Sequence, residues 1–303
     1  MKLRCIAALI LTGASLAFTR DENVNLDDLL KSGEQWLREN VDEKTLSALS
    51  DMEPEELEKL CRELEKRFQG EYVIDLASLR QFAVALVSEL EKHEETQPYA
   101  GWLRARLDYM VVAERLRPAV SPSIKPVPNP PPQMERQVWQ TQLDNRPLPP
   151  AAEKFVSRLK PIFAAQQVPS ELVWLAEVES LFDPRAQSPS GAAGLFQLMP
   201  GTARQQGLSL RPRDERLNPE KSAQATARYL KYLHGRFTDW KLSVAAYNAG
   251  EGRVRELLNK HKATTFDDIA IRLPAETQLY VPKVEATLQR REGVQLAKLA
   301  NPR

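Results

Sequence analysis

One glutamate on an expected helix is the residue of this sequence best suited to chemistry. Glu179 follows Ala176 by three residues and Leu172 by seven, so it shares their face of a helix. A carboxylate on a core-facing apolar stripe is costly unless it is paired or used. Burial would raise its pKa toward the range in which it can donate a proton. The alternative is a helix-end carboxylate that reaches water. The neighbouring Glu177 is expected to face solvent.

The loop after this helix has the composition of a ligand-binding loop. Residues 188–194 read SPSGAAG, and Gly191 and Gly194 would let the backbone approach a ligand closely. Gln197 follows, and its side-chain amide can both donate and accept hydrogen bonds. An acid on an apolar face beside a glycine-containing loop and an amide fits a sugar-cleaving site.

A second catalytic carboxylate is not evident in the sequence. Most glycosidases use two carboxyl groups, one as acid and one as nucleophile or base. Asp183 precedes Pro184 at the expected end of the helix, where it is expected to cap the turn. Glu251 lies beside an Asn-Ala-Gly turn and is expected to be a surface or structural residue.

The order of these residues resembles the catalytic domain of the soluble-lytic-transglycosylase family, and the membrane-bound lytic murein transglycosylase D type is the nearest match. The resemblance rests on ES at 179–180, Ser188, GAAGLFQLMP at 191–200, AYNAGEG at 246–252 and ETQLYVP at 276–282. It covers roughly residues 136–292 and implies a mainly α, lysozyme-like (goose-type) catalytic domain.

The resemblance also implies a reaction without water, cofactor or metal. Enzymes of this family cleave the β-1,4 bond between N-acetylmuramic acid and N-acetylglucosamine in peptidoglycan. The substrate supplies the nucleophiles: the N-acetyl oxygen assists departure, and the C6 hydroxyl then attacks C1 to give a 1,6-anhydro sugar. Glu179 would serve first as the acid and then as the base.

Five further residues receive roles from the resemblance. Ser180 and Gln197 would orient the sugar or Glu179, Tyr247 and Asn248 would line the cleft, and Tyr280 would approach the acid. Each has a structural alternative. The tyrosines could be core aromatics with a satisfied hydroxyl, and the asparagine could simply adopt a turn conformation.

Two other functions stay open. A goose-type lysozyme has a related core but hydrolyses the bond with water, so the mass of the product separates it from a transglycosylase. A non-catalytic peptidoglycan-binding protein is the other alternative, and a turnover assay would separate it from both enzymes.

The chain divides into four expected parts. Residues 1–17 have the charged start and short apolar run of a signal peptide. Residues 20–117 predict a separate module of three to five amphipathic helices. Residues 118–135 predict a linker, with seven prolines between Pro118 and Pro132. Residues 136–303 form the expected catalytic domain, also mainly helical.

The charge of the C-terminal part favours action on an anionic polymer, and the signal peptide predicts export. Residues 118–303 hold 26 Lys and Arg against 18 Asp and Glu, whereas residues 21–117 hold 13 against 23. The basic part suits cell wall, and no nucleic-acid motif is present. The sequence predicts a periplasmic location, with association with membrane or wall left open. The acidic module is either a solvated bundle or a docking site for a cell-wall protein. Cys61 is expected to be a packed core thiol, and the three histidines show no metal-ligand spacing.

Overall fold

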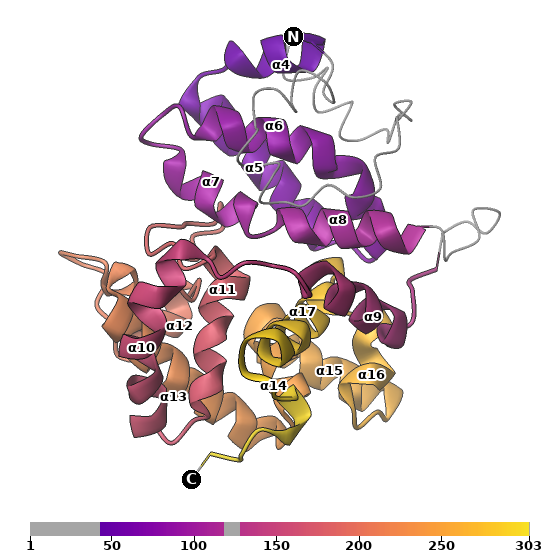
Figure 1. Cartoon of the computed structure of the whole chain (residues 1–303), viewed down its shortest axis with the longest axis vertical. Helices are drawn as coiled ribbons and strands as arrows, with labels where there is room; N and C mark the ends of the chain where they lie inside the picture. The colour runs from indigo at the N-terminus through magenta and orange to yellow at the C-terminus, as the bar shows by residue number, and fades with distance from the viewer. Residues whose placement is uncertain (1–42, 118–127, 303) are drawn as a thin grey trace.

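A computed structural model describes residues 43–117 and 128–302, and these residues are mainly helical (Figure 1). The α-helices are α4 (Glu43–Ser50), α5 (Pro54–Phe68), α6 (Arg80–Leu90), α7 (Gln97–Arg104), α8 (Leu107–Leu116), α9 (Pro132–Leu143), α10 (Pro150–Ala165), α11 (Leu175–Ser180), α12 (Pro200–Gln205), α13 (Pro219–Phe237), α14 (Trp240–Ala249), α15 (Glu251–His261), α16 (Phe266–Ile269) and α17 (Ala275–Glu292). Short 3₁₀ helices are η1 (Val73–Leu79), η3 (Ser170–Trp174), η4 (Glu215–Leu217), η5 (Ala270–Arg272) and η6 (Leu296–Lys298). Within the two described ranges there is no strand, only isolated bridges within the loop before α12. The predicted mainly α fold class is confirmed.

Several helix starts follow the local signals of the sequence. The Asn218 side chain accepts a hydrogen bond from the Lys221 backbone N–H at the start of α13, and Pro219 occupies the first helical position. Asp239 caps α14 in the same way, by accepting from the Leu242 N–H. Asn218 with Pro219, and Asp239, are residues that the sequence alone marks as helix starts, because these capping interactions are local.

Two stretches expected to be single helices are broken. The apolar spacing from Leu76 to Leu90 predicts one helix, but the chain forms η1 and α6 there. The spacing from Trp102 to Val111 predicts another, but the chain forms α7 and α8. At the second break, the Ala105 carbonyl accepts a hydrogen bond of 2.7 Å from Lys283 Nζ of α17. A contact distant in sequence therefore uses a backbone group that a continuous helix would have bonded internally. The helix predicted from the apolar spacing of Leu29 to Leu37 and the signal peptide predicted at residues 1–17 lie outside the described residues.

The N-terminal segment (residues 43–117) and the C-terminal segment (residues 128–302) share one hydrophobic core. Figure 1 shows α8 lying across α9 and α17. The Tyr109 ring meets the Trp139 ring edge-on at 5.5 Å, and Phe68 packs against both Tyr109 and Trp102. Buried charges also cross between the segments, because Asp108 of α8 pairs with Arg146 and Lys283. The division into two domains stays a prediction, and the structure packs these parts together.

The end of the predicted linker is attached to both segments. The Asn129 side chain accepts a hydrogen bond from the Val73 N–H and donates to the carbonyls of Glu71 and Ile271. Helix α9 begins at Pro132, within the range expected to be linker, and residues 118–127 lie outside the described part. Among the described residues, no helix is both long and apolar enough to cross a membrane. Cys61 is fully buried in α5, as predicted.

Candidate active site

Glu179 lies on α11, a short helix at the centre of the C-terminal segment. Its side chain is buried, with the residue only 4% exposed, and so are Leu172, Leu175 and Ala176 of the predicted stripe. The prediction for Glu177 is wrong: it is 2% exposed and forms a two-pronged ion pair with Arg291 of α17, at 2.9 Å for each contact. Neighbouring elements enclose α11 on all sides, so no face of this helix is left for solvent.

The backbone after Glu179 is held in a conformation that large residues avoid. Helix α11 ends at Ser180, three residues before the predicted end, and Leu181 and Phe182 follow with φ of 53° and 61°. Left-handed backbone at bulky residues is costly and persists only where surrounding contacts impose it. The buried Phe182 ring supplies such contacts, because it packs against Phe155 and Trp174.

The surroundings of Glu179 give its carboxyl group a pKa near neutrality. The pKa of Glu179 is raised to about 7, mainly by burial and to a smaller extent by the negative charge of Glu276. The positive charges of Arg106 and Lys283 and a hydrogen bond from Tyr280 act in the opposite direction. The Tyr280 hydroxyl donates to Glu179 Oε1 at 2.6 Å, from the buried face of α17. A carboxyl group with this pKa can be protonated or ionised near pH 7, so it can both give and take a proton.

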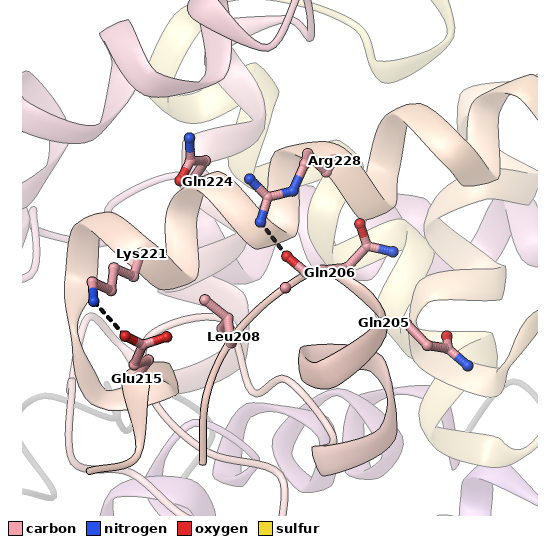
Figure 2. Close-up of a pocket in the computed structure, with 8 residues that line it drawn as sticks. Gln205, Gln206, Leu208, Glu215, Lys221, Gln224 and Arg228 are labelled. Atoms are coloured by element: carbon pink, nitrogen blue, oxygen red, sulfur yellow. Dashed lines mark hydrogen bonds and ion pairs between the residues drawn. The ribbon is translucent and has the colours of Figure 1, made fainter. Parts of the chain in front are cut away.

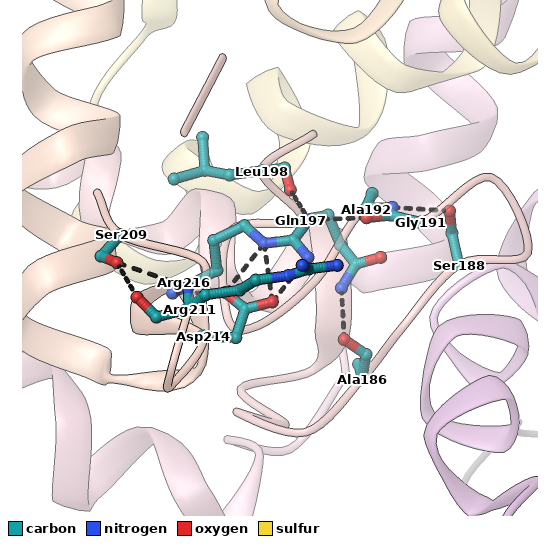
Figure 3. A network of polar contacts seen from close by, with 10 residues as sticks. All are labelled: Ala186, Ser188, Gly191, Ala192, Gln197, Leu198, Ser209, Arg211, Asp214 and Arg216. Atoms are coloured by element: carbon teal, nitrogen blue, oxygen red, sulfur yellow. Dashed lines mark hydrogen bonds and ion pairs between the residues drawn. The ribbon is translucent and has the colours of Figure 1, made fainter. Parts of the chain in front are cut away.

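The structure places Ser180 and Gln197 as supports of the loop. The Ser180 hydroxyl donates to the Leu195 carbonyl at 2.8 Å and lies 3.2 Å from the Ala176 carbonyl. Gln197 Nε2 donates to the carbonyls of Ala186 and Gly194, both at 2.9 Å (Figure 3). Gln197 Oε1 is buried without a partner in the structure, so it is the atom of this amide that is available to a ligand.

Tyr247 and Asn248 join α14 to the loop and to α17. The Tyr247 hydroxyl donates to the Phe196 carbonyl at 2.6 Å. Burial raises the pKa of Tyr247, and the negative charge of Glu179 raises it further. Asn248 Oδ1 accepts a hydrogen bond of 2.6 Å from the Thr277 hydroxyl. Tyr247 and Tyr280 thus approach the acid from elements that are distant in sequence, whereas the contact of Asn248 is with α17.

Glycine is favoured at positions 194 and 191 of the loop for different structural reasons. Gly194 has φ of +81°, and a Cβ there would lie 2.1 Å from the Arg216 carbonyl oxygen, so only glycine fits. Gly191 has φ of +87°, and a Cβ there would make only an ordinary contact with Pro200 at 4.0 Å, so its backbone conformation alone favours glycine. Its carbonyl accepts a hydrogen bond from the Arg216 guanidinium at 2.6 Å.

Arg216 is a loop-supporting residue that sequence reasoning missed. Its buried guanidinium donates to the carbonyls of Gly191 and Leu198 and pairs with Asp214 (Figure 3). The guanidinium thus links the two ends of the loop at residues 191–198 to each other and to the Asp214 carboxylate. Arg216 is one of two arginines in the RDER stretch at 213–216, and no spacing in the sequence would have identified this role.

One further carboxylate, Glu276, lies near the acid, and a second, Glu65, lies near Glu276 and Arg106, although the sequence indicated neither. Glu276 of α17 forms an ion pair with Arg106 at 2.9 Å. Glu65 of α5 accepts a hydrogen bond of 2.7 Å from the Ser190 hydroxyl, and burial raises the pKa of Glu65. Each of these carboxylates pairs with a residue more than a hundred positions away, so local spacing in the sequence could not reveal either contact.

A polar cavity of about 610 Å³ lies between α12 and α13, away from Glu179 (Figure 2). Its lining residues are Gln205, Gln206, Gly207, Leu208, Glu215, Lys221, Gln224 and Arg228. Lys221 pairs with Glu215, and Arg228 donates to the Gln206 carbonyl. Its two cations are therefore already engaged within the protein.

Comparison with known proteins relates one part of the chain to one family. The family described as Transglycosylase SLT domain matches residues 162–269. Membrane-bound lytic murein transglycosylase D of Escherichia coli is 43% identical over 125 residues, which is 40% of this chain and 28% of that protein. Soluble lytic murein transglycosylase of Salmonella typhimurium is 38% identical over 121 residues, which is 37% of this chain and 19% of that protein.

A solved structure also resembles the chain. The 70 kDa soluble lytic transglycosylase of Escherichia coli has 20% sequence identity and a TM-score of 0.43, over 91% of this chain and 46% of that one. The two curated relatives named above are similar to this chain over less than a third of their own length. Within the matched range lie Glu179, the glycine loop and the Tyr-Asn pair of α14. Over residues 162–269, the chain is therefore similar to the family described as Transglycosylase SLT domain.

Proposed function

We propose that this protein is a peptidoglycan lytic transglycosylase. It cleaves the β-1,4 bond between N-acetylmuramic acid and N-acetylglucosamine without water and leaves 1,6-anhydro ends. The observation that carries the proposal is the state of Glu179, which is buried, hydrogen-bonded by Tyr280 and has a pKa of about 7. The named relatives are lytic murein transglycosylases, and the similarity covers the part of the chain that holds this residue.

The proposed chemistry uses Glu179 in both steps. Protonated Glu179 gives its proton to the glycosidic oxygen as the C1–O bond breaks, and the carboxylate then takes the proton of the C6 hydroxyl as that oxygen attacks C1. The proton balance closes on one residue, so no water is consumed. A pKa close to the working pH suits a group that alternates between acid and base. The Tyr280 hydroxyl holds Oε1, which fixes the orientation of the carboxyl group.

The alternative of hydrolysis has less support. Hydrolysis by two carboxyl groups needs a second one free to act as nucleophile or base. The two candidates near the site are engaged: Glu276 with Arg106, and Glu65 with Ser190. A goose-type hydrolase and a non-catalytic wall-binding protein remain the outcomes that an assay must separate from the proposed reaction.

The remaining site residues are proposed either to contact the sugar chain or to hold the loop that binds it. Gln197 would offer its free Oε1 to the substrate, while Ser180 holds the loop. Tyr247 and Asn248 would line the cleft. Peptidoglycan strands are the proposed substrate, and we propose a location outside the inner membrane, where that polymer lies. A cell-wall protein that docks on the N-terminal segment is part of the same proposal.

The proposed function is tested on purified, insoluble peptidoglycan. Release of soluble muropeptides with anhydro ends, lighter by one water than hydrolysed ends, is the expected result. Hydrated ends alone would assign a hydrolase. Sedimentation of the protein with the polymer, with no release over extended incubation, would assign a binding protein.

Replacing Tyr280 by phenylalanine should keep the fold and lower turnover. The variant loses the hydrogen bond that lowers the pKa of Glu179, so that pKa should rise. Wild-type turnover should decline as the pH rises through about 7, where the acid ionises, and the decline should occur at higher pH in the variant. A pH profile of release, with circular dichroism as the folding control, measures both effects. Equal rates and an unmoved profile would mean that Tyr280 only packs.

A further inference from the structure

A buried arginine of the N-terminal segment, Arg106, contacts the backbone of α11 at Glu179. Arg106 lies between α7 and α8 and is 7% exposed. Its Nη1 is 3.5 Å from the Glu179 backbone carbonyl and 3.3 Å from the Trp102 carbonyl. Its Nη2 is 2.9 Å from Glu276 Oε1. One guanidinium thus contacts α7, α11 and α17 at the same point.

The planar shape of arginine is needed for these contacts. Its five N–H groups form a rigid fork, whereas lysine has a single ammonium on a flexible stem. The guanidinium also lies 4.9 Å from the centre of the Trp102 ring, which fixes its plane. A lysine at position 106 could keep the positive charge but could not hold Glu276 and both carbonyls together.

The charge of Arg106 acts on Glu179 as well as on Glu276. Burial lowers the pKa of Arg106, but the two carboxylates raise it by more, so the group remains a cation. That cation lowers the pKa of Glu179, opposing burial. The other titratable groups that interact with Glu179 are Tyr280, Tyr247, Tyr109, Glu276 and Lys283, and of these only Lys283 is a second cation.

Other contacts fasten the same segment to the loop that follows Glu179. The Gln187 N–H donates to the Pro98 carbonyl at 2.9 Å. Ser190 donates to Glu65 of α5. Gly101 of α7 packs so closely that a Cβ there would lie 2.4 Å from Asp183 Oδ2. Helices α5 and α7 therefore hold both sides of the loop, and Arg106 holds the helix before it.

We propose that Arg106 is a positioning residue for Glu179, so that the N-terminal segment is a working part of the active site. It fixes the carbonyl end of α11 against Glu276 and sets the electrostatic surroundings of the acid. Arg106 lies outside the range that matches the SLT family, so this role is a property of the whole chain. The proposal rests on the proposed function for its effect on turnover, but its electrostatic part can be measured without turnover.

The test compares Arg106→Gln and Arg106→Lys with a matched control, Arg146→Gln. Arg146 is also buried and also pairs across the two segments, with Asp108, but it does not contact Glu179. Arg106→Gln should lower kcat on the order of 10²-fold, the cost of a small misplacement of a catalytic group. KM should change little, and the decline of turnover at high pH should move upward. Arg106→Lys should lower kcat but keep the profile near that of wild type.

Arg146→Gln should lower the melting temperature without moving the pH profile. If Arg106→Gln gives the same profile as Arg146→Gln, the role of Arg106 is only structural and the proposal fails. If Arg106→Gln does not fold, Arg106→Lys decides, because full kcat in that variant would contradict positioning by the guanidinium.

A measurement independent of turnover separates this proposal from the proposed function. The pKa of Glu179 follows from the pH dependence of the unfolding free energy of the wild type compared with Glu179→Gln. A folded pKa raised from 4.5 to about 7 means that stability falls as the pH rises across that window. In the Arg106→Gln background the window should extend to higher pH. An unchanged window overturns the inference even if the wild type is active, and an extended one supports it even if no peptidoglycan is cleaved.

Discussion

Glu179→Gln is expected to lose nearly all turnover on peptidoglycan while still binding the polymer. Glutamine has almost the same shape but cannot donate a proton as an acid does. General acid–base catalysis is typically worth about 10²–10⁴-fold, and here one group serves both steps. The melting temperature should stay level or rise, because the amide avoids the cost of an ionised carboxylate at a site that is 4% exposed. Release of anhydro-muropeptides and thermal unfolding measure the two effects.

Asp183→Asn is the control for this variant. Asp183 lies four residues on and accepts a hydrogen bond from the Arg185 N–H, so its carboxylate is engaged in the local turn. We expect this variant to retain most of the activity. Near-normal release by Glu179→Gln would remove the proposed mechanism. A collapse of equal size in Asp183→Asn would mean that a second carboxylate takes part.

Asp108→Asn is expected to cause the largest loss of stability. Asp108 is fully buried and is paired with two buried cations, Arg146 and Lys283. Removing one partner from a buried ion pair costs about 3–5 kcal/mol because the remaining charge is uncompensated. Lys283, whose pKa burial already lowers to about 8, would lose the anion that opposes this shift. Denaturant unfolding of the full chain measures the loss.

The pH dependence of stability gives a second test of this group. Burial raises the pKa of Asp108, but Arg146 and Lys283 lower it by more, so it lies below the ordinary 3.8. The stabilisation is therefore present above that pH and is lost as the pH falls below it. Asp267→Asn is the control, because its pair with Arg136 is partly exposed and should contribute about 1 kcal/mol or less. Equal losses in the two variants would contradict the account of Asp108.

The features predicted correctly from the sequence are those that local residues determine. The stripe that buries Glu179 follows from helical spacing, and the starts of α13 and α14 follow from Asn218 and Asp239, which bond backbone groups three residues on. Gly194 was expected to let the backbone approach a ligand, whereas the structure places it at a positive φ against the Arg216 carbonyl.

The features that were missed depend on partners distant in the chain. Glu177 was expected in solvent because it points away from the apolar stripe, yet Arg291 of α17, 114 residues away, pairs with it. The break between α7 and α8 reflects Lys283, 178 residues away from the carbonyl that it bonds. The contacts of Arg106 and Glu65 with the site have the same origin. Periodicity describes one element at a time, so it could not show that the N-terminal segment helps to build the site.

The central claim is that Glu179 and the substrate complete the reaction without water. The most direct test is digestion of purified peptidoglycan in heavy-oxygen water, followed by mass analysis of the new muramic acid ends. The account predicts anhydro ends that carry no heavy oxygen, together with loss of these products in Glu179→Gln. New ends that carry one heavy oxygen would show that water attacks C1, and this result would contradict the proposed transglycosylase reaction.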